Sequence, residues 1–259
     1  SGLTMAVGLD ASRSSVEARV FQRAIPGGAL KEDLAWDEGV MLHKLSAFAQ
    51  TTIDLGSRVK LTGGLRADEV SALDDGFEFS PRGSVLIDLG SGVTAQAGGG
   101  LYHQAPSLIA LSVKDNGRPI NLSLRQQRNV QVASGVSWTV NQGFRLSAEA
   151  FWKEYSRVPL LVSDPRVSVS NLGGDYGFVG AEPLTDDGTG RARGLEIFAQ
   201  QKLLQNSYFL GAYTLSWSEF AGMDGRLRPS AWDRRHALDL TGGYRVGSWE
   251  FGSKLRVLS

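Results

Sequence analysis

The chain has 259 residues, with 27 Lys and Arg against 27 Asp and Glu, and it contains no cysteine. The neutral charge balance gives no electrostatic basis for binding nucleic acid, and the absence of cysteine excludes disulfides, thiolate zinc sites and a cysteine nucleophile. With 42% apolar and 21% charged residues, the composition is neither that of a disordered chain nor that of a bundle of membrane helices.

Segments of alternating apolar and polar residues follow one another along the chain, separated by two kinds of connection. These are short polar connections near 54–58, 90–92, 141–143, 205–207 and 246–248, and long irregular ones near 24–38, 71–81, 106–128, 157–192 and 220–234. Because the two kinds alternate, all short turns are expected at one end of the sheet and all long loops at the other. The pattern predicts about eleven antiparallel strands of about ten residues or more, the length that crosses a bilayer at a tilt.

Each predicted strand has one face that is almost free of charge and one face with charges in mid-strand. The charged set comprises Glu149, Lys153, Glu196, Asp239, Arg245, Lys254 and Arg256. In a membrane barrel these side chains must face the lumen, since a charge facing lipid costs roughly 2–4 kcal/mol near the bilayer midplane. In a soluble antiparallel sandwich they would form the solvated face instead.

Aromatic residues gather near both ends of the predicted strands. Trp138, Phe144, Tyr208, Phe209, Tyr244 and Trp249 flank the short turns, and Trp152, Tyr155 and Trp217 lie towards the long loops. Two aromatic girdles are typical of membrane barrels, because amphipathic rings are stable at the level of the lipid headgroups. Together with the strand length and the sorted loops, this pattern favours a membrane barrel over a sandwich.

Five stretches carry a family resemblance. They are LSAFAQTTIDLGSRVKLTGGLRAD (45–68), SPRGSVLIDLG (80–90), VTAQAGGGLYHQAPSLIAL (93–111), GRARGLEIFAQ (190–200) and SAWDRRHALDLTGGYRVG (230–247). In this order and spacing they resemble the barrel of TonB-dependent outer-membrane receptors, except that Ala67 stands where an aromatic residue is usual.

The resemblance implies an all-β, antiparallel up-and-down transmembrane β-barrel in the Gram-negative outer membrane, with short periplasmic turns and long extracellular loops. Barrels of this family have about 22 strands around a plugged lumen, so residues 1–259 are expected to be part of one barrel, without its plug and its last strands. The implied function is the gated import of a scarce ligand such as an iron siderophore or cobalamin. The implied partners are outer-membrane lipid, TonB through a plug domain outside this chain, and a small-molecule or metal-chelate ligand, with no cofactor.

The outer loops supply the candidates for ligand contact. Arginine and tryptophan there suit ligands with carboxylate or phosphate groups, although the same residues can simply clamp loop to strand. A metal site is not expected at His103, which has no His or Cys nearby, and the Asp186-Asp187 run lacks the alternating carboxylates of a calcium loop. The candidates are His103, Arg125, Arg128, Tyr176, Trp232 and Arg234.

Three other functions stay open at the level of the sequence. A passive porin would need neither a plug nor TonB. A soluble β-sandwich binding protein would pack its apolar faces on each other and stay in solution without detergent. An enzyme barrel would need a nucleophile and a base, and no serine in a strained elbow accompanies the Asp-Arg-Arg-His run at 233–236, so no catalytic residue is expected.

Overall fold

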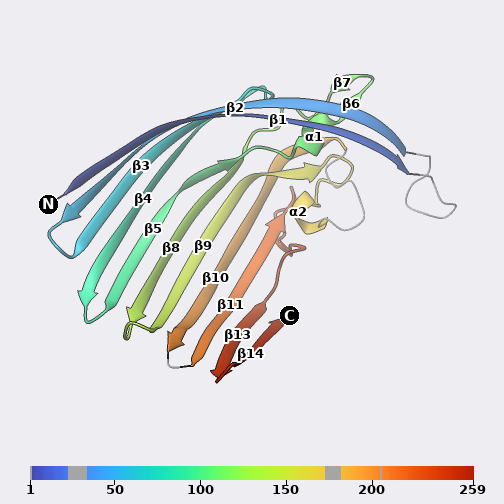
Figure 1. Ribbon diagram of the computed structural model, residues 1–259. Helices are drawn as coiled ribbons and strands as arrows, with labels where there is room; N and C mark the ends of the chain where they lie inside the picture. The colour runs from blue at the N-terminus through green and yellow to red at the C-terminus, as the bar shows by residue number, and fades with distance from the viewer. Residues whose placement is uncertain (1, 23–33, 173–181, 205) are drawn as a thin grey trace.

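The long strands form one curved antiparallel sheet (Figure 1). A computed structural model of the chain describes residues 2–22, 34–172, 182–204 and 206–259. The strands of the sheet follow the chain in the order β1 (Leu3–Gln22), β2 (Leu34–Leu55), β3 (Val59–Val70), β4 (Phe77–Gly90), β5 (Val93–Gln104), β8 (Gln127–Thr139), β9 (Phe144–Leu161), β10 (Leu184–Leu204), β11 (Ser207–Ala221), β13 (His236–Val246) and β14 (Trp249–Leu258).

The remaining elements are short and lie in the connections. They are α1 (Leu108–Ser112), the hairpin of β6 (Lys114–Asp115) and β7 (Arg118–Pro119), α2 (Val169–Leu172), and β12 (Arg228–Pro229), which pairs with β11. In the part of the chain that the structure describes, no helix is both long and apolar enough to cross a membrane.

The predicted up-and-down order is confirmed, with short turns at one end of the sheet and long connections at the other. The strands extend further towards the long loops than predicted. Strand β4 begins at Phe77, β9 runs to Leu161 and β10 begins at Leu184. The alternation of apolar and polar residues fades in these stretches, but pairing with neighbouring strands still holds them extended, as at Leu161 opposite Leu184.

Strand pairing divides the sheet into two faces. On the face that we call the apolar face, one cross-strand row joins Val85, Ala97, Ser134, Ala150, Leu195 and Leu215. The opposite or polar face carries rows such as Leu86, Gln96, Gly135, Glu149, Glu196 and Thr214. Large apolar side chains on the apolar face are exposed, for example Val7, Leu9 and Trp249, with Leu9 at 83%.

The aromatic residues do not all share one face. Trp138, Phe144, Phe209, Tyr244 and Trp249 lie on the apolar face near the short turns, and Trp152 and Trp217 lie on it further along. Tyr155 and Tyr208 point to the polar face, where Tyr155 packs on Phe220 with 5.4 Å between ring centroids. An aromatic residue near a strand end therefore belongs to a girdle only when its position in the strand also directs its side chain to the apolar face.

The buried core lies at the long-loop end. Leu42 and Val70, from the polar face of β2 and β3, pack with Leu73 and with Leu111 of α1. A second cluster joins Ala110 and Leu124 to Leu184 at the start of β10. The 105–126 connection is therefore folded against the sheet.

Asn121 ties two long connections together. It is fully buried, and its side-chain amide donates to the carbonyls of Ala110 and Glu182, each at 2.9 Å. Its side-chain oxygen accepts the backbone N–H of Leu184 at 3.0 Å. One side chain thus satisfies three backbone groups from segments far apart in the sequence.

Replacing Asn121 with leucine should release the 105–126 connection from the sheet. The change leaves three backbone polar groups without this partner, each at a cost of about 1–3 kcal/mol when buried. Hydrogen exchange at Leu184, whose backbone N–H loses its acceptor, should become faster by at least about tenfold, while exchange in mid-strand stays slow. The exposed Ser123 on the same connection gives a matched control, and equal exchange in Asn121→Leu and Ser123→Ala would contradict the assignment.

Candidate functional site

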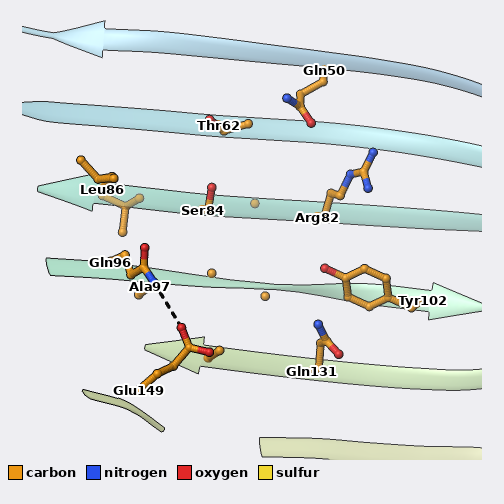
Figure 2. A pocket seen from close by; sticks show the side chains of 15 residues that line it. Gln50, Thr62, Arg82, Ser84, Leu86, Gln96, Ala97, Tyr102, Gln131 and Glu149 are labelled. Atoms are coloured by element: carbon orange, nitrogen blue, oxygen red, sulfur yellow. Dashed lines mark hydrogen bonds between the residues drawn. The ribbon is translucent and has the colours of Figure 1, made fainter. Parts of the chain in front are cut away.

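A shallow polar hollow lies on the polar face in the middle of the sheet (Figure 2). Its volume is about 360 Å³. Side chains from six neighbouring strands line it, including Gln50 of β2, Thr62 of β3, Arg82 of β4, Tyr102 of β5, Gln131 of β8 and Glu149 of β9. It is rich in hydrogen-bonding groups and borders only a few apolar side chains.

Arg82 stands free in this hollow because glycine flanks it on both sides. The pairing register sets Gly64 opposite Arg82 on one side and Gly100 opposite it on the other. A Cβ at Gly100 would lie 2.8 Å from the Arg82 Cβ and 2.9 Å from the carbonyl oxygen of Pro81, closer than real Cβ atoms come. Arg82 is exposed, and within the described residues it has no ion pair.

The two ends of the hollow differ in charge. Arg82, Tyr102 and Gln131 lie at one end, and Gln96 and Glu149 lie towards the other (Figure 2). The amide of Gln96 donates to a carboxylate oxygen of Glu149 at 3.1 Å. Glu196 is the cross-strand neighbour of Glu149, so negative charge concentrates at that end.

The charged mid-strand residues all fall on the polar face. This follows from the register for Glu149, Lys153 and Glu196 in β9 and β10, and for Asp239, Arg245, Lys254 and Arg256 in β13 and β14. Arg256 donates to Asp239 at 2.6 Å, and Arg245 donates to Glu250 at 3.0 Å. Such cross-strand pairs stabilise a sheet modestly. Lys254 and Glu196 have no ion pair within the described residues, so their charges can interact with other groups.

His103 is not open to a ligand, because its side chain is only 2% exposed. Pairing between β4 and β5 stops at Arg82 and Gly100, next to Pro81, whose nitrogen carries no hydrogen to donate to a ladder. Beyond that point His103 bridges the two strands, with Nδ1 3.1 Å from the hydroxyl of Ser80 and Nε2 3.2 Å from Glu78.

The other outer candidates do not form one site. Arg125 makes a two-pronged contact with Asp186, at 2.7 and 3.0 Å, and so joins the 105–126 connection to β10. Arg128 is exposed on β8, opposite His103. Trp232 and Arg234 are exposed before β13, and β9, β10 and β11 lie between them and β8. Tyr176 lies outside the described residues.

The loop after β11 carries a carboxylate that stays ionised. Hydrogen bonds from the Arg228 guanidinium, and then from the backbone N–H of Arg226, lower the pKa of Asp224 to about 2. The ion pair between Asp224 and Arg228, at 2.6 Å, is therefore fully formed at neutral pH, and it is lost only as the pH falls from about 4 towards 2.

The free guanidinium of Arg82 and its polar neighbours were missed from the sequence alone. The available signal was glycine: Gly63-Gly64 and Gly98-Gly99-Gly100 mark strands that leave room for a long side chain between them. The arrangement can bind and orient an anionic or hydrogen-bonding group. Among the described residues, no group of three or more His, Asp or Glu could hold a metal ion.

The chain matches one family model and resembles many solved structures. The family model described as TonB dependent receptor-like, beta-barrel matches residues 13–257. Similar structures include the ferric-catecholate import receptor Fiu from E. coli K12, with 14% identity, a TM-score of 0.72, and coverage of 98% of this chain and 41% of that one. No curated protein matches.

Two further structures show the same fold. The copper transporter OprC has 18% identity and a TM-score of 0.68, and the match covers 99% of this chain and 40% of that one. The siderophore receptor PiuA from Acinetobacter baumannii has 12% identity and a TM-score of 0.71, with coverage of 99% and 43%. The chain thus spans about two fifths of the length of these structures. With a family match over nearly its whole length, the chain belongs to the TonB-dependent receptor β-barrel family.

Proposed function

We propose that this chain forms part of the wall of an outer-membrane receptor that imports a scarce ligand in a TonB-dependent manner. The observation that carries the proposal is the division of one long-stranded sheet into an exposed apolar face and a polar face with a hollow around Arg82. An apolar face of this kind suits lipid, and a polar face suits a wet lumen. Family membership adds TonB as the energy-coupling partner, reached through a plug domain elsewhere in the protein.

The ligand that fits the hollow best is an anionic metal chelate. An exposed guanidinium without a carboxylate partner can bind a carboxylate or phenolate oxygen through charge-assisted hydrogen bonds. Similar structures are described as a ferric-catecholate import receptor, a copper transporter and a siderophore receptor. We therefore place iron siderophores first among the ligands, ahead of cobalamin and other chelates.

The wall itself needs no covalent chemistry for this function. Its polar side chains would hold the ligand or the plug while TonB supplies the mechanical work. Glu149 at one end of the hollow, beside its cross-strand neighbour Glu196, and Arg82 at the other end offer opposite charges to complementary groups on the ligand or the plug. We expect Glu149, Lys153, Glu196, Asp239, Arg245, Lys254 and Arg256 to face the lumen. We expect Arg128 at the start of β8, and Trp232 and Arg234 in the loop before β13, to be the candidates open to ligand.

The assignment of faces predicts opposite outcomes for neighbouring substitutions. Ala148→Arg places a charge on the apolar face and should block stable insertion, since its cost is roughly 2–4 kcal/mol near the midplane. Glu149→Leu, on the polar face, should be tolerated. The fraction of heat-modifiable, detergent-extracted protein from outer membranes measures both, and equal insertion of the two variants would count against this assignment.

Uptake of labelled chelates tests the function directly. Cells that express the full-length protein carrying this chain should accumulate at least one of a ferric catecholate, a ferric hydroxamate, a copper chelate and cobalamin, and should lose that uptake when TonB is deleted. Uptake that persists without TonB would indicate a passive porin, and no uptake of any probe would reject import of these ligands.

Arg82→Gln should weaken uptake of the accepted chelate by about tenfold, because a charge-assisted hydrogen bond contributes about 1.5–3 kcal/mol. The expected change is in the apparent affinity at low chelate concentration. Arg58→Gln removes the same charge in the short turn between β2 and β3 and is the matched control. If both variants take up the chelate like the wild type, Arg82 does not contact it.

A further inference from the structure

A ladder of arginine and tryptophan side chains crosses the apolar face on β9, β10 and β11. The register sets Trp152 opposite Arg193, and Arg193 opposite Trp217. The guanidinium carbon of Arg193 lies 5.5 Å from the Trp152 ring centroid and 5.4 Å from that of Trp217. Arg193 is thus held between two indole rings, each a favourable cation–π partner.

Two more arginines extend the ladder, but each of them has a carboxylate. Arg191 lies 5.6 Å from the Trp152 ring and pairs with Glu219 at 3.5 Å. Arg235 lies 5.2 Å from the Trp217 ring and pairs with Asp233 at 2.9 Å.

The remaining nearby carboxylate is also engaged. Glu154, the cross-strand neighbour of Arg191, accepts the indole N–H of Trp152 at 2.8 Å. Within the described residues, Arg193 is therefore the arginine of the ladder that has ring contacts and neither an ion pair nor a hydrogen bond from its side chain.

The ladder lies about one bilayer crossing away from the girdle at the short turns. A barrel strand crosses the apolar layer in roughly 9–11 residues. On the apolar face, the stretches from Phe144 to Trp152 and from Phe209 to Trp217 each span nine residues from the short-turn girdle. Beside the ladder, towards mid-sheet, exposed side chains are apolar, as at Val132 and Leu195.

A groove on the apolar side leads to the ladder. Its volume is about 670 Å³, and its lining includes Val85, Ala97, Val132, Ala150 and Trp152. The small side chains in the row Ala97, Ser134 and Ala150 leave a depression between the larger Val85 and Trp152. An acyl chain lying there would bring its headgroup to the level of Trp152 and Arg193.

We propose that Arg193, held between Trp152 and Trp217, binds the phosphate of a membrane lipid whose acyl chain lies in this groove. A guanidinium offers a planar fork of donors that matches phosphate geometry, and the two rings orient it without consuming those donors. The lipid site requires the apolar face to contact lipid, but it does not require import. The lipid-site proposal and the import proposal can therefore fail separately.

Lipid retention by the full-length protein tests the site. The protein is purified in a phosphate-free maltoside detergent and titrated, under native mass spectrometry, with phosphatidic acid or with diacylglycerol of the same acyl chains. The wild type should bind phosphatidic acid at least about tenfold more tightly, the equivalent of one charge-assisted hydrogen bond. Arg193→Gln should abolish this preference, and Arg193→Lys, which keeps the charge without the planar fork, should reduce it.

Lys153→Gln is the matched control, because it removes a charge next to Trp152 in the chain but on the polar face, and it should keep the preference. Wild-type preference in Arg193→Gln, or equal retention of the two lipids by the wild type, would overturn the site. Inorganic phosphate binding as tightly as phosphatidic acid would make it a free-anion site and would also overturn it. If Arg193→Gln loses its heat-modifiable gel mobility, and so does not fold, the test uses Arg193→Lys and Trp217→Leu instead. If both of these variants keep the wild-type preference for phosphatidic acid, the proposal is rejected.

Discussion

Antiparallel pairing between neighbouring strands determines the two faces of the sheet, the hollow and the groove. Backbone groups in mid-strand are satisfied by the neighbouring strand, and the two-residue period sends alternate side chains to opposite faces. A slip of one residue anywhere would move charges such as Glu149 to the apolar face and Leu195 to the polar one. Because neighbouring strands pair in one order from β1 to β14, and the register shifts only near strand ends, a short-range pattern becomes a property of the whole sheet.

The interruptions in this register have local functions. At Pro81 the pairing of β4 with β5 ends, and His103 with Glu78 closes the opening. Near the outer end of β9, Arg157 has a positive φ of 57°, and its guanidinium also contacts Glu78. The register with β10 shifts close by, at Gly188. Charged side chains thus replace backbone pairing where the strands approach the long connections.

Glycine controls what the polar face can expose. Where strands bring side chains opposite each other, long residues usually cover one another or form cross-strand pairs, as Asp239 and Arg256 do. Gly64 and Gly100 remove that cover around Arg82. The same principle of small neighbours acts on the apolar face, where Ala97 and Ala150 leave the groove that ends at Trp152.

The sequence was enough to predict the strand order, the sorting of short turns and long loops, and the polar-face position of Glu149, Lys153, Glu196, Asp239, Arg245, Lys254 and Arg256, because all three depend on period and chain order alone. It misplaced Tyr155 and Tyr208, since distance from a turn does not define a face. It also stopped several strands too early, where pairing overrides a fading pattern. Contacts between strands and connections are needed to see that the His103 side chain is buried, that Arg125 forms an ion pair with Asp186, and that Arg82 and Arg193 have no carboxylate partner within the described residues. Those outcomes depend on which residues of different strands lie side by side, and that is set by register and loop packing over distances that no local pattern encodes.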